Sequence, residues 1–136
     1  MTSNAKKINE LERKLERESV MESGGIWTAY TPNVTAASGA LTTVSATGIY
    51  SIIGKTVLVN IDITITTNGT GSVAILATLP VNAVGTQIIA GREDAVTGLM
   101  LQGLVGTNYC TIFAYDNSYP GGDGRILRLT GLYRAE

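Results

Sequence analysis

The stretch from Lys55 to Thr67 alternates between apolar and polar residues, and this pattern constrains the fold more than any other part of the sequence. Its regularly spaced apolar positions are Val57, Val59, Ile61, Ile63 and Ile65. Side chains alternate across a strand with a period of two, so one face of this segment is aliphatic and the other is wettable. β-branched residues on both faces favour a strand over a helix. The pattern predicts a long, half-buried antiparallel strand whose aliphatic face needs a second apolar layer.

Composition limits the classes of protein to which the chain can belong. Its 136 residues suit one domain with a small appendage, and 44% hydrophobic against 15% charged residues is enough for a packed core. The formal net charge of −1 does not supply the basic field that nucleic-acid binding needs. No apolar run approaches the length of a membrane-spanning helix, and the N-terminus lacks the apolar segment of a secretion signal. We therefore expect neither a nucleic-acid partner nor membrane insertion.

Charged residues are concentrated near the N-terminus, where residues 1–22 hold 10 of the 21 charged residues in the chain. Most residues there are good helix formers, and several opposite charges lie four positions apart, which stabilises a helix. The apolar residues Ile8, Leu11 and Leu15 follow the 3-then-4 spacing of a coiled coil. The sequence predicts a helix over residues 1–23 that serves as a self-association stalk or as an anchor in a larger assembly. A solvated helix that frays at its ends is the alternative.

The remainder of the chain is predicted to be β-structure. Two glycines end the helix, so residues 24–26 form a hinge and residues 27–136 form a separate β-domain. The predicted β segments, which we count as about eight strands, are Ile26–Tyr30, Val34–Ala37, Ala40–Ala46, Tyr50–Ile53, Lys55–Thr67, Val73–Leu79, Gln87–Gly91, Gly98–Val105, Tyr109–Tyr115 and Arg125–Tyr133. Nearly regular turn signals between them indicate an antiparallel β-sandwich of the jelly-roll kind.

Several segments of this β-domain resemble a known group of proteins. They are residues 41–50, residues 53–57, Asn68-Gly69-Thr70-Gly71, Thr78-Leu79-Pro80 and the closing Leu129-Thr130-Gly131-Leu132-Tyr133. Together they are similar to the C-terminal β-sandwich heads of tailed-bacteriophage fibres and spikes, over about residues 27–135. The resemblance implies a homotrimer of jelly-roll heads, displayed on the virion and touching the host surface. The short helix suits a small head spike, a fibre tip or a capsid-decorating protein.

Residues that commonly carry catalysis are scarce in this chain. It has no His, which excludes nucleophile systems and zinc sites that depend on that residue. Carboxylates for a glycosidase pair are available at Glu93, Asp94, Asp116 and Asp123. However, Glu93-Asp94 is interpreted as part of a polar turn, and the other two lie in a Gly-rich loop. We expect no enzymatic activity, no cofactor and no bound metal.

The loop from residue 115 to residue 125 is the preferred candidate for contact with an external ligand. Its candidate binding residues are Tyr115, Asp116, Asn117, Tyr119, Asp123 and Arg125. Aromatic faces combined with hydrogen-bonding side chains are suited to saccharides, by analogy with other binding sites. An ordinary exposed loop is the alternative. A Ca²⁺ site at three of these residues is a weaker possibility, because their spacing is not that of an EF-hand.

Two further predictions concern side chains of the strand before this loop. Tyr109, Phe113 and Tyr115 share one face of that strand, which we interpret as part of the core or of a subunit interface. Cys110 is the only cysteine, so it forms no disulfide within the chain, and we expect it to be a small side chain in the core.

The resemblance to phage fibre and spike heads, together with the scarcity of catalytic residues, implies a virion structural protein without catalytic activity, in which a fibre or spike tip binds host-surface polysaccharide during adsorption. Its expected partners are two further copies of itself, other virion proteins through the N-terminal helix, and a host-surface glycan. The alternative is a capsid decoration or cement protein that stabilises the particle and binds no receptor.

Overall fold

The structure is a computed structural model that describes residues 4, 6–13 and 26–136. Residues 4 and 6–13 are helical and exposed, as the sequence predicts for this segment. Ile8 and Leu11 of the proposed seam are 56% and 60% exposed, so neither is covered by the described part of the chain. Leu15 and residues 24–25 of the predicted hinge lie outside the described residues.

The β-domain contains nine strands. They are β1 (Thr28–Tyr30), β2 (Val34–Ser38), β3 (Thr43–Ile53), β4 (Thr56–Thr67), β5 (Ser72–Thr78), β6 (Gln87–Glu93), β7 (Met100–Val105), β8 (Tyr109–Ala114) and β9 (Arg125–Arg134). Every pairing between these strands is antiparallel. The predicted antiparallel, mainly β class is therefore confirmed.

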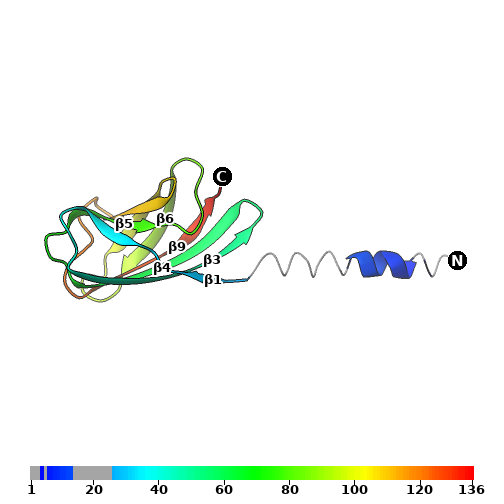
Figure 1. Cartoon of the computed structure of the whole chain (residues 1–136), viewed down its shortest axis with the longest axis horizontal. Coiled ribbons are helices and arrows are strands. Elements are labelled where there is room, and N and C mark those ends of the chain that lie inside the picture. Colours follow the sequence, from blue (N-terminus) through cyan, green and yellow to red (C-terminus); the bar gives the residue numbers. More distant parts are fainter. Residues whose placement is uncertain (1–3, 5, 14–25) are drawn as a thin grey trace.

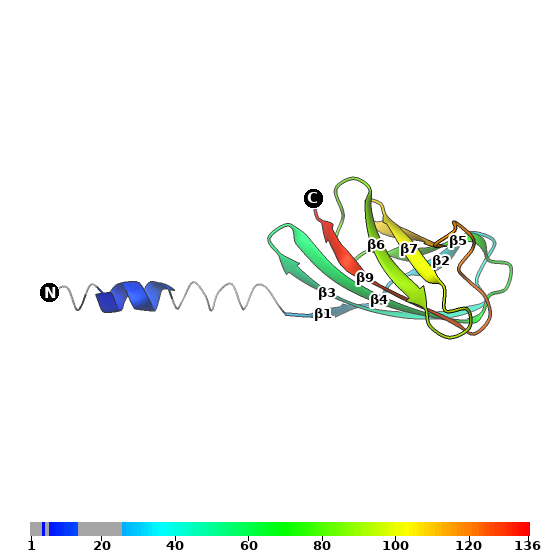
Figure 2. The ribbon, with the colours of Figure 1, turned by 180° about the vertical axis from the view of Figure 1, so that it is seen from behind.

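All nine strands belong to one sheet, in the order β1-β3-β4-β9-β6-β7-β8-β5-β2. The sheet curls, so that β1, β3 and β4 lie along one side and β2, β5, β6 and β7 lie opposite them (Figures 1 and 2). A curled sheet brings two layers of side chains together without dividing into two separate sheets. This strand order does not show the two separate sheets of a jelly-roll sandwich.

A hydrogen bond joins the two margins of the curled sheet. The Tyr30 hydroxyl in β1 donates to the carbonyl oxygen of Thr78 at the end of β5, at 3.2 Å. This bond connects β1, at one end of the strand order, with β5, next to the other end. The backbone amide of Asn33, directly before β2, donates to the hydroxyl of the same threonine at 2.8 Å and extends the pairing of β2 with β5.

The junction between β9 and β6 keeps the sheet continuous. Gly91 of β6 lies opposite Leu129 of β9, and a Cβ atom built on Gly91 would lie 1.9 Å from the carbonyl oxygen of Arg128. Only glycine permits so close an approach of two backbones. Gly91 thus permits the pairing of β6 with β9, through which the strands form one sheet where two separate sheets were predicted.

The segments predicted as Ala40–Ala46 and Tyr50–Ile53 are parts of one strand, β3. The glycine between them, Gly48, pairs with Ile61 in the middle of the β3–β4 ladder. A Cβ atom on Gly48 would lie 2.3 Å from the Tyr30 ring, so this glycine makes room for an aromatic side chain and does not interrupt the strand. Gly54, in contrast, has a φ of 61° in the turn between β3 and β4, as expected for a tight bend.

The aliphatic face of β4 lies at the centre of the core, as predicted. All five alternating residues from Val57 to Ile65 are at most 1% exposed. They belong to one cluster with buried side chains from β5, β6, β7, β8 and β9. Cys110 is fully buried in this cluster, and burial raises the pKa of its thiol to about 12. The expectation that it fills the core is confirmed.

The face carrying Tyr109, Phe113 and Tyr115 is not part of the core of the chain, so of the two expected roles only the subunit interface stays a prediction. Tyr109 is 44% exposed and Tyr115 is 63% exposed. The buried face of β8 consists of the alternate residues Cys110, Ile112 and Ala114. Apolar residues occupy both faces of β8, so the alternation of side chains along this strand does not predict which face points into the core.

Candidate functional site

A row of polar side chains crosses the outward face of β3, β4 and β9. Asp62 in β4 lies between Thr47 in β3 and Arg128 in β9. Asn60, two residues before Asp62 on the same face of β4, lies between Ile49 in β3 and Thr130 in β9. These β4 residues alternate with the buried isoleucines, so the burial of the core face fixes their outward direction.

Arg128 is held between two carboxylates. Its Nε donates to Asp94 Oδ2 at 3.0 Å, and one terminal nitrogen donates to Asp62 Oδ1 at 3.2 Å. All three side chains are about half exposed, so each ion pair adds at most about 1 kcal/mol of stability. Their main consequence is geometric, because two bonds to different elements restrict the rotation of the guanidinium group.

Two adjoining depressions lie over this row. The larger, of about 310 Å³, is lined by Asn60, Asp62, Arg128, Leu129 and Thr130. The smaller, of about 140 Å³, is lined by Thr47, Gly48, Ile49, Asn60 and Asp62. Because both are lined by Asn60 and Asp62, these two side chains lie where the depressions meet.

Several hydrogen-bonding groups at this place point outward without a bond to the described protein. The Asn60 side-chain oxygen accepts a bond from the Thr130 hydroxyl, which orients its amide and leaves the NH₂ group available. Asp62 uses one carboxylate oxygen for Arg128, and its second oxygen is available. We call Thr47, Asn60, Asp62, Arg128 and Thr130 the polar row. It combines donors and acceptors beside the aliphatic Ile49, a composition suited to recognition of a small polar ligand.

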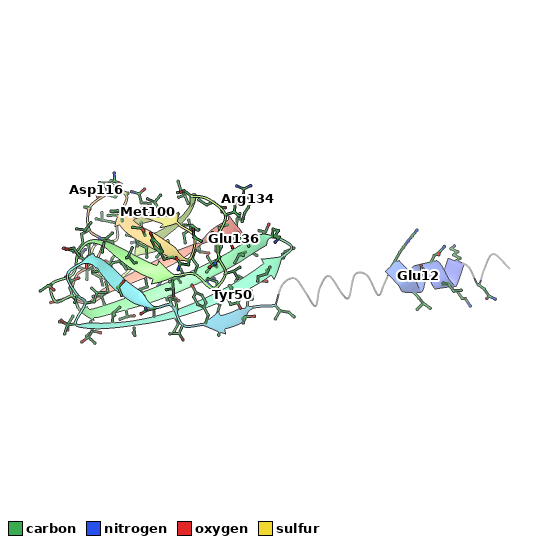
Figure 3. All side chains as sticks on the ribbon, turned by 45° about the horizontal axis from the view of Figure 1, so that its top comes forward. Glu12, Tyr50, Met100, Asp116, Arg134 and Glu136 are labelled. Atoms are coloured by element: carbon green, nitrogen blue, oxygen red, sulfur yellow. The ribbon has the colours of Figure 1, made fainter. Side chains whose placement is uncertain are left out.

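The predicted ligand-binding loop is bonded largely to the protein itself. The Asp116 carboxylate accepts bonds from the hydroxyl and the backbone amide of Ser118, at 2.5 and 3.1 Å. These two bonds lower the pKa of Asp116 below its ordinary value. Asn117 has a φ of 67°, and its side-chain oxygen accepts a bond from Gln102 at 2.7 Å. Figure 3 shows Asp116 at the outer margin of the β-domain.

Tyr119 and Asp123 attach the loop to the hairpin turn between β4 and β5. The Tyr119 hydroxyl donates to Asn68 Oδ1 at 2.6 Å, and the Asn68 backbone amide donates to Asp123 Oδ1 at 2.7 Å. Tyr119 also packs against the core, and its burial raises the pKa of its phenol against the opposing effect of Arg125. Both residues therefore have structural contacts within the β-domain, and Tyr119 is also part of its packing.

The six candidates of this loop do not converge on one surface. Arg125 folds back to donate to the carbonyl oxygen of Pro120 at 3.0 Å. Tyr115 extends from the end of β8, 63% exposed, and Asp116 bonds only within its own turn. Because most of these side chains bond to the protein itself, the polar row is a second candidate site, and the loop stays a prediction.

Glu93 is a buried residue whose importance the sequence analysis missed. It ends β6 and is 1% exposed, which corrects its assignment to a polar turn. One carboxylate oxygen accepts bonds from the backbone amides of Val96 and Thr97, and the other accepts from Ala95 and Ile126. Burial alone raises the pKa of this carboxyl, but the four amide bonds outweigh burial and lower it from 4.5 to about 2. Glu93 is thus an ionised structural group.

No signal in the sequence distinguishes Glu93 from an exposed turn residue. A Glu-Asp pair between two strands is typical of a solvated turn, and the decisive donor, Ile126, is 33 residues away. Part of the polar row could be inferred from the sequence, because Asp62 and Asn60 occupy the predicted outward face of the Lys55–Thr67 segment. Their β9 partners become visible only once the β4–β9 register is known.

Comparison of the chain with protein-family models, with curated proteins and with solved structures finds no match. Within the described part of the chain, no helix is both long and apolar enough to cross a membrane. The same residues contain no group of three or more His, Cys, Asp or Glu side chains placed to hold a metal ion. The polar row is therefore the feature from which we infer a function.

Removing the Tyr119 hydroxyl should measurably destabilise the β-domain. Tyr119→Phe loses the bond to Asn68 Oδ1 and leaves that acceptor without its donor, so we expect a loss of about 0.5–1.5 kcal/mol in the free energy of unfolding. Urea denaturation provides the measurement. Tyr115→Phe, at an exposed position, is the matched control and should change the stability very little. Equal losses in both variants would show that the Tyr119 bond does not form.

Proposed function

We propose that this chain is a structural protein of a tailed-bacteriophage particle, with a jelly-roll-like head that binds host-surface polysaccharide during adsorption. The resemblance of the β-domain to phage fibre and spike heads motivates the first part. The observation that supports the second is the polar row, which places unoccupied hydrogen-bonding groups in open depressions on the outward face of the sheet. Such a surface is open to a long polymer, unlike a deep pocket that encloses a small molecule.

A binding role fits these residues better than catalysis. Glu93 is buried and accepts four backbone bonds, so it is unsuited to proton transfer with a substrate. Asp62 and Asp94 are both bonded to Arg128. Asp116 accepts bonds within its own turn, and Asp123 accepts a bond from Asn68 in the hairpin turn. These five carboxylates of the β-domain thus have structural partners, which supports a protein without enzymatic activity.

The binding proposal is tested with the full chain. The labelled protein is applied to an array of bacterial surface polysaccharides and to intact bacteria from which these polysaccharides come. We expect binding to at least one polysaccharide, competed by the same polysaccharide in solution. Absence of binding to every polysaccharide and every bacterium would contradict the adsorption role.

A second candidate is a capsid decoration or cement protein, and a separate surface favours it. An aliphatic row runs across the outward face through Leu58, Leu132, Ile88 and Leu104. Leu132 is 59% exposed and Ile88 is 67% exposed. Neighbouring exposed aliphatic side chains are typical of contacts with other proteins. Cryo-electron microscopy of the particle would separate the roles, because a cement protein lies flat between capsid subunits and an adsorption head projects from the particle.

The proposed particle protein is also expected to be a parallel homotrimer, held in part by Ile8, Leu11 and Leu15. Light scattering of the full chain should give three times the 14.3 kDa mass of one chain. The double substitution of Ile8 and Leu11 by Asp should lower that mass, because charges do not pack in a coiled-coil seam. Glu12→Ala is the control on the same helix. A monomer at every accessible concentration, with the helix intact by circular dichroism, would contradict the trimer.

A further inference from the structure

We infer that the polar row binds neutral sugars through pairs of neighbouring hydroxyl groups and discriminates against acidic sugars. The inference rests on the proposed function for its biological ligand, a polysaccharide, and adds the chemical class of the sugar and the residues that contact it. It is carried by three features of the row, which are its unoccupied donors and acceptors, the negative charge of its available acceptor and its size.

The unoccupied groups match a pair of hydroxyls. A hydroxyl group both donates and accepts, so a sugar diol needs an acceptor and a donor a few ångströms apart. Asp62 offers its second carboxylate oxygen as the acceptor, and Asn60, two residues along the same strand face, offers its amide NH₂ as the donor. Side chains at positions i and i+2 of a strand lie on one face, so both can contact one sugar ring. Ile49, opposite Asn60, adds an aliphatic surface for the carbon atoms of the ring.

Both groups are oriented before a ligand arrives. The Thr130 hydroxyl fixes the Asn60 amide, and the Arg128 guanidinium fixes the Asp62 carboxylate. Such bonds reduce the side-chain freedom that is lost on binding, which favours affinity for a weakly interacting sugar.

The available acceptor of the row is negatively charged, which selects against an anionic ligand. Arg92 of β6, which is opposite Arg128, lines neither depression, so it lies outside the place where a ligand would meet Asn60 and Asp62. Arg128 already directs bonds to both aspartates, so it is not available as an unpaired cation. A carboxylate of an acidic sugar would instead approach the available oxygen of Asp62, where like charges repel.

The volume of the site limits the contact to a short part of the polymer. The larger depression measures about 310 Å³, at the lower end of the roughly 300–1,000 Å³ of ordinary small-molecule pockets. The smaller one adds about 140 Å³ beside it. Weak binding of a single unit is strengthened when several copies of the site engage one polymer.

The test uses the ¹⁵N-labelled full chain and nuclear magnetic resonance titration with simple probes. The neutral probes are the methyl glycosides of mannose, glucose and galactose, and the acidic probe is methyl glucuronide. We expect at least one neutral glycoside to shift the side-chain amide signal of Asn60 and the Nε signal of Arg128, and methyl glucuronide to bind more weakly. Shifts confined to other regions, no shift with any neutral glycoside, or a preference for methyl glucuronide would each overturn the inference.

Substitutions sharpen this test. Asp62→Asn and Asn60→Ala should each weaken binding of the neutral glycoside by about tenfold or more. Asp62→Asn keeps one oxygen for Arg128 and replaces the available acceptor by an NH₂ donor, whereas Asn60→Ala removes the donor. Asp62→Asn should also strengthen binding of methyl glucuronide, because it removes the repelling charge. Thr64→Ala, at the next outward position of β4, is the control and should bind like the unchanged protein. Unchanged binding in both site variants would overturn the assignment.

The array experiment separates this inference from the proposed function. If the unchanged protein and the Asp62→Asn variant bind a bacterial polysaccharide equally, the adsorption role stands and the polar row is not its site. If neutral glycosides bind at the polar row but no bacterial polysaccharide or bacterium is bound, the sugar site stands and the adsorption role fails.

Discussion

Glu93→Gln is expected to lower the free energy of unfolding at neutral pH by about 3 kcal/mol, among the largest effects of any single substitution in this chain. The lowered carboxyl pKa, from 4.5 to about 2, corresponds to this amount because one pKa unit equals about 1.4 kcal/mol. Glutamine keeps the shape of the side chain but replaces one acceptor oxygen by an NH₂ group. At least two of the backbone N–H groups that bond to Glu93 would then face this NH₂ group, which is itself a donor and cannot accept their bonds.

The effect of Glu93 should depend on pH in a defined direction. Its folded-state pKa lies below its unfolded value, so its contribution is fully present above about pH 4.5 and is lost as the pH falls towards 2. Urea denaturation of the unchanged protein and of Glu93→Gln at several pH values measures this. The stability difference between them should shrink across that interval.

Asp94→Asn provides the matched control for Glu93→Gln. Asp94 follows Glu93 directly, but its carboxylate is about half exposed and contributes only an ion pair with Arg128. We expect this variant to lose less than about 1 kcal/mol. If the two variants lost the same amount, or if Glu93→Gln kept the full stability at neutral pH, the buried amide bonds would not hold Glu93 ionised.

Ile63→Ala is the second substitution with a large expected effect. Ile63 is fully buried at the middle of β4, with β3 and β9 on either side. Truncation leaves a cavity that the two neighbouring strands cannot easily close. We expect a loss of about 2–5 kcal/mol out of a typical ~5–15 kcal/mol of total stability, and a similar loss for Ile61→Ala. Denaturant unfolding followed by circular dichroism measures this loss.

Asp62→Ala tests whether the two faces of β4 differ as the structure shows. Asp62 lies between Ile61 and Ile63 but points outward, where it is about half exposed and pairs with Arg128. Its removal should cost less than about 1 kcal/mol. A loss as large as that of Ile63→Ala would mean that the outward face of β4 is buried between subunits in the assembled protein.

The sequence by itself determined the local features of this protein. The alternation from Val57 to Ile65 was enough to give the strand and its inward face, because side-chain direction in a strand depends only on position along the chain. The helical character of residues 6–13 and the tight turn at Gly54 were likewise predicted from neighbouring residues. Each of these features depends on interactions within a few positions of the chain.

Only the tertiary structure decided which distant segments meet. Asp62 reaches Arg128 across 66 positions, and the Glu93 carboxylate receives the amide of Ile126. The loop expected to be free is tied to the hairpin turn through Tyr119 and Asn68. These contacts require the register of β4, β9 and β6, which is set by burial of the whole core and by the close approach at Gly91. Local propensity carries no information about that register, so the candidate site became visible only when the sheet was assembled.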